Sequence, residues 1–160
     1  MCVIYRKRHT IRSRLRLAEQ LALRRAGIKK SQLSELSPRL IHSLTRIPLS
    51  RAKELSALIQ FENCTSVGPS TAQDLWNLGY RSLKDLQDED PTEIYERLCR
   101  QVGNRVDPCL LDVFRSIIAQ AKNPNLPVDQ RNWWYWTPHR RDAGRSVSLR
   151  LLRPRKGARL

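Results

Sequence analysis

The sequence predicts an all-α protein, a compact bundle of about five or six short helices with basic flanking extensions. Apolar residues recur at helical spacing, most clearly in the series Leu110, Val113, Phe114, Ile117 and Ile118. Residues that cap helices stand directly before prolines at several places. No stretch alternates apolar and polar residues, so the sequence predicts no β-strand.

Each expected helix has a local start or stop signal, because a side-chain oxygen can cap free N–H groups and proline has no N–H group to lose. The expected helices run from Ile11 to Ala26, Pro38 to Leu44, Ser50 to Gln60, Pro69 to Leu78, Ser82 to Leu86, Asp90 to Val102 and Asp107 to Ala121. The start signals after the first helix are Ser37, Ser50, Pro69, Ser82 with Asp85, Asp90 and Asp107. The stop signals are Gly27, Pro48, Gly79, Gly103 and Asn123.

The segment between two of these helices, residues 64–68, is predicted to form a phosphate-binding turn. Gly68 tolerates a positive φ and allows close approach, so we expect the turn to be built on it. Pro69 then opens a helix whose first N–H groups point outward at the positive end of the helix dipole. The expected contacts are the backbone amides around Val67, Gly68, Ser70 and Thr71. The alternative is a structural helical hairpin that binds nothing.

The formal net charge of +15 is concentrated in the flanks. Residues 1–60 hold 14 Lys or Arg against 3 Asp or Glu, residues 61–136 hold 8 against 11, and residues 137–160 hold 8 against 1. Basic flanks around a mildly acidic centre fit an anionic polymer better than a small acidic substrate. Charge alone does not separate DNA from RNA, and a solubilising extension without a single partner is the alternative.

The first expected helix is basic and has several candidate roles. It could lie on a phosphate backbone, an acidic protein or an anionic membrane surface, or it could only cap the core. No apolar stretch approaches roughly 18 residues, so we expect no membrane span. Residues 1–30, with Glu19 as their single acid, faintly resemble a mitochondrial transit peptide. The flank residues expected to bind nucleic acid are Arg12, Arg14, Arg16, Arg24, Arg25, Lys29 and Lys30.

The four cysteines predict neither a metal site nor a disulfide framework. Cys2, Cys64, Cys99 and Cys109 have no C-x-x-C spacing and no neighbouring His pair, so we expect reduced, buried thiols in a cytoplasmic protein. Cys99 and Cys109 lie on successive expected helices, and a redox role for them is the alternative.

The sequence also lacks the signature of an active site. It has no paired carboxylates in a recognisable setting, no Ser/His/Asp order and no phosphate-loop lysine. Asp107 and Asp112 are interpreted as a helix cap and a surface residue. We therefore expect a non-enzymatic protein with no catalytic residue, metal or cofactor.

The aromatic run Trp133-Trp134-Tyr135-Trp136 contains three of the four tryptophans. Aromatic clusters stack on unpaired bases or clamp back on a helical core. We favour the structural clamp for this run. Beyond Thr137 the chain is polar and basic, and we expect it to be disordered.

Several separated motifs occur in a fixed order. They are residues 47–55 (IPLSRAKEL), residues 66–69 (SVGP), residues 78–86 (LGYRSLKDL), Asp90-Pro91, residues 95–99 (YERLC), residues 106–109 (VDPC), Phe114-Arg115 and a terminal Trp pair. Over roughly residues 46–138 this order resembles the small bacterial helix-hairpin-helix proteins of the pathogenicity-locus family, some of them labelled mitomycin-resistance proteins. The expected domains are a basic, partly helical extension (1–45), a helix-hairpin-helix domain (46–138) and a basic tail (139–160).

The resemblance implies a helical fold and a presumed DNA-binding role without established enzymatic activity, and the mitomycin label suggests a link to DNA damage. This chain departs from the usual hairpin pattern, because Ser66 replaces the first glycine and Ser70 and Thr71 stand where a cation is common. The predicted function is sequence-independent nucleic-acid binding, with DNA favoured over RNA. The alternative is a protein-interaction or dimerisation module whose hairpin packs on a partner helix.

Overall fold

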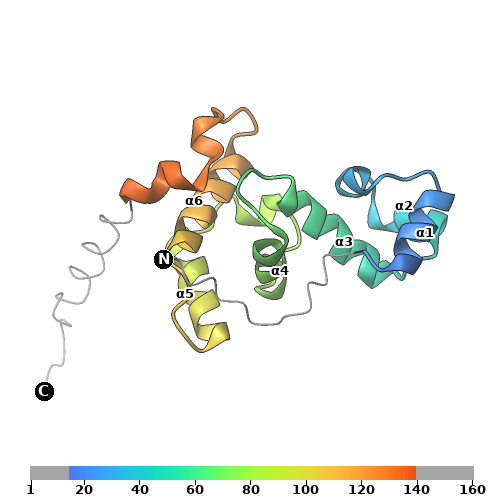
Figure 1. Ribbon diagram of the computed structural model, residues 1–160, viewed down its shortest axis with the longest axis horizontal. Helices are drawn as coiled ribbons and strands as arrows, with labels where there is room; N and C mark the ends of the chain where they lie inside the picture. Colours follow the sequence, from blue (N-terminus) through green and yellow to red (C-terminus); the bar gives the residue numbers. More distant parts are fainter. Residues whose placement is uncertain (1–14, 140–160) are drawn as a thin grey trace, which may run out of the picture.

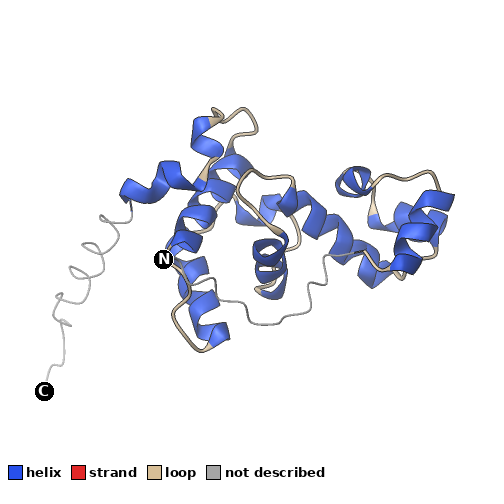
Figure 2. Ribbon diagram, viewed as in Figure 1, coloured by secondary structure: helices blue, strands red, loops and turns tan. Residues whose placement is uncertain are grey.

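The computed structural model describes residues 15–139, and within this range the protein is helical with no β-strand (Figure 1 and Figure 2). The all-α prediction is confirmed. None of the described helices has the length and apolar character needed to cross a membrane. The α-helices are α1 (Leu17–Arg25), α2 (Pro38–Thr45), α3 (Leu49–Glu62), α4 (Pro69–Asn77), α5 (Pro91–Val102) and α6 (Cys109–Lys122). The 3₁₀-helices are η1 (Lys30–Ser34), η2 (Leu83–Leu86), η3 (Asp129–Arg131) and η4 (Trp133–His139).

Local caps place several helices where the sequence predicts them. Ser37 Oγ accepts a hydrogen bond from the backbone N–H of Leu40 at 3.2 Å and caps α2. Asp90 caps α5 by accepting from the N–H of Thr92 at 2.6 Å, and Gly103 ends that helix with a left-handed φ of 74°. These boundaries depend on neighbours within a few residues, which is why the sequence predicts them well.

Leu15 and Arg16 precede helix α1, although the sequence predicts a helix through them. Arg16 has an extended backbone and is the N-cap, so the helix starts at Leu17. The Glu19 side chain accepts from the Arg16 N–H at 2.8 Å, which fixes this start. The predicted start at Ile11 lies outside the described residues.

Helix α3 also begins at a different residue from the one predicted. Pro48 is its N-cap and Leu49 its first residue, so the prediction that Ser50 caps this helix is wrong. The carbonyl of Pro48 accepts the first helical hydrogen bond, from the N–H of Ala52 at 2.8 Å. Proline suits this place because the amide that it lacks has no helical partner.

Helix α3 is shared by two hydrophobic cores, and in Figure 1 it runs between the α1–α2 group and the α4–α6 group. Its residues in the N-terminal core are Ala52, Leu55 and Ile59, which pack with residues of α1, η1 and α2. Its residues in the larger core are Ala57, Leu58 and Phe61, which pack with residues of α4, η2, α5 and α6. At 100° per residue the two stripes lie roughly 140° apart, on nearly opposite faces of the helix.

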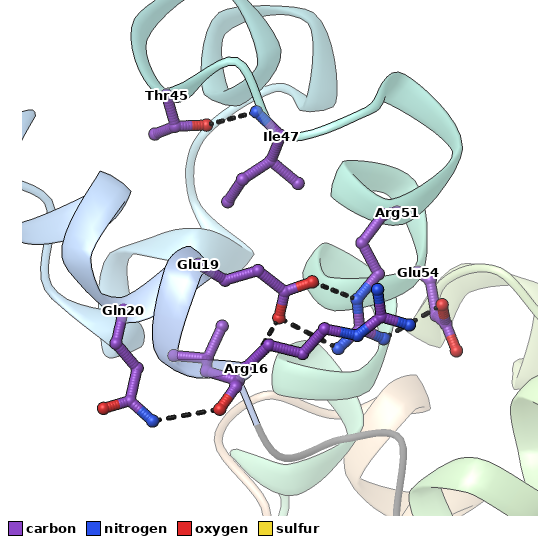
Figure 3. Close-up of polar contacts among 8 residues, drawn as sticks. Arg16, Glu19, Gln20, Thr45, Ile47, Arg51 and Glu54 are labelled. Carbon is purple, nitrogen blue, oxygen red and sulfur yellow. Dashed lines mark hydrogen bonds and ion pairs between the residues drawn. The ribbon is translucent and has the colours of Figure 1, made fainter.

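A buried ion pair holds α1 on α3 (Figure 3). Glu19 accepts hydrogen bonds from Arg51 Nε at 2.8 Å and from the backbone N–H of Arg16 at 2.8 Å. Arg51 also pairs with Glu54 at 3.0 Å. Burial would raise the pKa of Glu19, but the hydrogen bonds from Arg51 and Arg16 outweigh it and lower this pKa below its ordinary value of 4.5. The attachment of the basic helix therefore depends strongly on one carboxylate.

We predict that Glu19→Gln lowers the free energy of unfolding by about 1.5–3 kcal/mol, because the charge-assisted hydrogen bonds are lost. Since the folded pKa of Glu19 is lowered, its contribution is present above the unfolded pKa and is lost as the pH falls through the folded value. Denaturant unfolding at a series of pH values measures both effects. The exposed Glu35 provides the matched control, since Glu35→Gln is expected to change stability by less than about 0.5 kcal/mol. Equal effects of the two variants would contradict the proposed attachment.

Candidate nucleic-acid interface

The turn between α3 and α4 takes its left-handed residue from Ser66 and not from Gly68; we call α3, α4 and this turn the α3–α4 hairpin. The N–H of Val67 donates to the carbonyl of Cys64 at 3.2 Å, which closes a tight turn with Ser66 at φ 72°. Gly68 has φ −89° and ψ 171°, because it is the N-cap of α4 and precedes a proline. The prediction of a turn built on a positive φ at Gly68 is therefore wrong.

Side chains from the C-terminal part of the protein fix this turn. Gln120 of α6 accepts from the N–H of Thr65 at 2.9 Å and donates to the Thr65 carbonyl at 3.1 Å. Ser66 Oγ accepts from the backbone N–H of Trp133 at 3.0 Å and donates to the carbonyl of Arg131 at 3.4 Å. The turn is therefore held in a defined position relative to α6 and the aromatic segment.

The start of α4 is exposed at this turn. Gly68, Pro69 and Ser70 are exposed, whereas the side chains of Val67 and Thr71 are buried. No residue of the described range accepts a hydrogen bond from the N–H groups of Gly68, Ser70 and Thr71. The N–H of Val67 is already bonded to the turn itself. The three remaining donors lie at the positive end of the α4 dipole, where an anion is favoured.

The structure brings some of the predicted cations together. Arg12 and Arg14 lie outside the described residues. The other cations predicted to bind nucleic acid are all exposed: Arg16, Arg24, Arg25, Lys29 and Lys30. A groove between α1 and η1 is lined by Leu15, Gln20, Leu23, Arg24, Ile28, Lys29 and Lys30. Lys30 Nζ donates to Glu62 Oε2 at 3.1 Å, at the end of α3 that leads into the turn. Lys30 thus links this basic groove to the α3–α4 hairpin.

The acidic centre pairs several of its own arginines with carboxylates, whereas three of the cations predicted to bind nucleic acid have no such partner in the described structure. Arg97, Arg105 and Arg115 pair with Glu89, Glu96 and Asp112 at 3.9, 2.8 and 3.1 Å. Among residues 15–139, no carboxylate pairs with Arg24, Arg25 or Lys29. These three side chains therefore leave positive charge on the N-terminal flank that no described carboxylate compensates.

Asp112 is fully buried, so its interpretation as a surface residue is wrong. The carboxylate accepts from Arg115 at 3.1 Å and from Thr137 Oγ1 at 3.2 Å. Helix η4 packs on α6 and supplies Thr137. Local sequence does not reveal this covering segment, which lies 25 residues further along the chain.

The tryptophans of η4 differ in exposure. Trp136 is half-buried, its Nε1 donates to the carbonyl of Gln130 at 2.9 Å, and its ring meets Tyr135 edge-on at 5.4 Å. Trp133 and Trp134 are 36 % and 55 % exposed. Successive residues of a 3₁₀-helix point about 120° apart, so they cannot all face α6. The prediction that the aromatic run packs on the helical core therefore fits Trp136 and is wrong for Trp134.

The thiols of Cys64 and Cys99 are buried, as predicted, and no disulfide joins Cys99 to Cys109. Burial raises the pKa of Cys64 to about 11, so its thiol stays protonated near neutral pH. Cys2 lies outside the described residues. In the part of the chain that the structure describes, no three His, Cys, Asp or Glu side chains gather as a metal site requires.

Gln120 is a residue of the candidate interface that the sequence analysis missed. Its Nε2 donates to the Oγ of Ser116 at 3.0 Å, and Ser116 is fully buried in the apolar face of α6. Two polar residues four positions apart in an apolar stripe indicate that a polar partner packs there. The sequence contains that signal but does not identify Thr65 as the partner.

Comparison with known proteins gives two matches. The family model described as Pathogenicity locus matches residues 54–142, more than half of the chain. The Mitomycin resistance protein McrB of Streptomyces lavendulae is 42 % identical over 76 residues, which cover 48 % of this chain and 69 % of that protein. No solved structure matches the chain significantly.

We predict that Ser66→Gly is more stable than Ser66→Ala by roughly 0.5–1 kcal/mol. Both variants lose the hydroxyl bonds to Arg131 and Trp133, but only glycine adopts the left-handed backbone without strain. Denaturant unfolding of the two variants measures the difference. An alanine variant at least as stable as the glycine variant would show that this residue is not left-handed in solution.

We further predict that Trp136→Ala lowers the free energy of unfolding by about 2–3 kcal/mol. This is less than the loss expected for truncating a fully buried tryptophan, because Trp136 is only half-buried. Trp134→Ala is the matched control in the same helix, and we expect it to change stability by less than about 1 kcal/mol. Thermal unfolding followed by circular dichroism compares the two. The assignment of Trp136 as the structural residue fails if the order is reversed.

Proposed function

The chain belongs to the pathogenicity-locus family, as the order of its motifs predicts, and from this membership we propose a function for it. It is a non-enzymatic cytoplasmic protein that binds the nucleic-acid backbone through the α3–α4 hairpin and its basic flanks. The hairpin acts as a helix-hairpin-helix motif, and binding does not depend on base sequence. The relative's name, Mitomycin resistance protein, favours DNA over RNA and a link to DNA damage.

The observation that carries this proposal is the exposed start of α4. The N–H groups of Gly68, Ser70 and Thr71 have no acceptor in the described structure, and they lie at the positive end of a nine-residue helix. The bonds from Gln120 and Ser66 hold the turn in place before any ligand arrives. A phosphate oxygen that binds there therefore meets positioned donors, and little ordering opposes binding.

The N-terminal flank supplies the long-range attraction that the hairpin lacks. Ser70 and Thr71 carry no charge, so the hairpin contributes hydrogen bonds and the attraction of its dipole. Arg24 and Lys29 line one groove and have no carboxylate partner among residues 15–139, which concentrates positive charge on the flank. Phosphates neutralised by these cations release counterions, and this release drives sequence-independent binding.

A protein-interaction or dimerisation module is the second candidate. Four leucines of the N-terminal helices are exposed although leucine usually packs in a core: Leu17 and Leu21 of α1 and Leu40 and Leu44 of α2. In that case the α3–α4 hairpin packs on a partner helix and the flanks bind an acidic protein.

We predict that Gly68→Glu weakens binding to duplex DNA about 10- to 100-fold, because an anion then occupies the anion site. The variant folds, since a Cβ at Gly68 meets no atom within 4 Å and the backbone there is not left-handed. The isosteric control Gly68→Gln adds the bulk without the charge, and it retains much more affinity. Fluorescence anisotropy with labelled duplex DNA measures both, and circular dichroism checks the fold.

Ser70→Lys tests the same site in the opposite direction. It restores the missing cation, so we expect tighter binding and a plot of log affinity against log salt that is steeper by about 0.9. Neutralising Arg24, Arg25 and Lys29 together makes that plot shallower by up to about 2.7. If folded Gly68→Glu and Ser70→Lys both bind like the parent protein, the hairpin is not the phosphate site and the protein-interaction function is favoured.

A further inference from the structure

Two exposed tryptophans belong to the segment whose backbone bonds the turn of the proposed phosphate site. Trp134 is 55 % exposed and Trp133 is 36 % exposed. No hydrogen bond holds the indole N–H of either residue within the described structure, whereas the Nε1 of Trp136 is bonded to Gln130. Packing and a hydrogen bond therefore account for a tryptophan at position 136, but they do not account for the exposed tryptophans at 133 and 134.

We propose that Trp133 and Trp134 form a stacking surface for unpaired bases, so that the preferred ligand is single-stranded nucleic acid or the single-stranded arm of a branched DNA. This inference rests on the proposed function, because it specifies which nucleic acid the backbone site holds. Aromatic side chains stack on the faces of unpaired bases, and every base presents such a face.

The position of the indoles relative to the hairpin supports this ligand. The N–H of Trp133 donates to Ser66 Oγ at 3.0 Å, so the aromatic segment touches the turn directly. Gly68 follows two residues later, at most roughly 7 Å further along the chain. Phosphates held at the start of α4 therefore bring neighbouring nucleotides close to the exposed indoles.

The charge of the following sequence favours an anionic occupant over a second copy of this chain. Residues 137–160 contain 8 Lys or Arg against 1 Asp, and they continue directly from the aromatic run. Two such segments brought together in a symmetric dimer would repel each other. The phosphates of a polynucleotide instead attract these cations and are neutralised by them.

A fully paired duplex offers no free base faces on which the indoles could stack, because its bases already stack on one another. A single strand offers phosphates to the α4 site and base faces to Trp133 and Trp134 at the same time. The stacking surface therefore affects the preference between single and double strands, while the charged groups set the salt dependence.

The test compares full-length protein with Trp134→Ala and Trp134→Phe. The probes are a labelled oligothymidine of about 15 nucleotides, within the range of known single-strand sites, and a blunt duplex with the same number of phosphates. We expect Trp134→Ala to bind the oligothymidine about 5- to 100-fold more weakly, whereas Trp134→Phe retains most of the affinity. Duplex affinity and the salt dependence of both complexes should stay unchanged, because no phosphate contact is removed.

Each other outcome overturns the inference in a recognisable way. Equal single-strand binding by Trp134→Ala and the parent protein refutes the stacking surface, and the proposed function then stands or falls on duplex binding by the Gly68 variants. Loss of both affinities together assigns Trp134 to the fold or to the backbone site. A parent protein that self-associates in sedimentation, and a Trp134→Ala variant that does not, identifies the indoles as an interface between copies.

Discussion

Helix α3 buries side chains on two nearly opposite faces, and it contributes residues to both hydrophobic cores of the described structure. One face belongs to the core of α1, η1 and α2, and the other belongs to the core of α4, η2, α5 and α6. A helix of this length spans roughly 20 Å. Arg51, the partner of Glu19, lies near its start, and Glu62, the partner of Lys30, lies at its end. The Glu19–Arg51 pair fixes the orientation of α1 on this helix. The relation between the flank cations and the exposed start of α4 therefore depends on α3 remaining a single helix.

The hairpin turn shows how a strained residue can be kept at a useful place. Ser66 adopts a backbone conformation that glycine would adopt more easily, but a glycine could not bond Arg131 and Trp133. The hydroxyl thus compensates for the strain by tying the turn to a segment 65 to 67 residues further along the chain. The departure from the usual two-glycine pattern has a structural reason, and it places the aromatic segment beside the start of α4.

The sequence predicts features set by neighbouring residues and misses those set by distant ones. Ser37, Asp90 and Gly103 act on groups within a few positions, and their caps and stops are confirmed. The buried Asp112 and the exposed Trp134 are decided by how η4 lies on α6, which no local pattern specifies. The sequence predicts the left-handed position at Gly68 because glycine is the usual choice, yet an N-cap before proline requires an extended backbone. The sequence thus predicts where along the chain α4 starts, but the conformation of the turn before it depends on the tertiary structure.

The family match and the helix in which it starts do not begin at the same residue. The family match starts at residue 54, inside α3, although this helix begins at Leu49 and Ala52 already contributes to a core. The segment before the match is therefore more than an appendage, because it covers an apolar face of a helix that the family shares. A fragment of this chain that began at residue 54 would leave Leu55 and Ile59 without the α1, η1 and α2 side chains that cover them. Water would then reach one apolar stripe of α3, so the matched range alone is a poorer unit for expression than the range that includes the N-terminal helices.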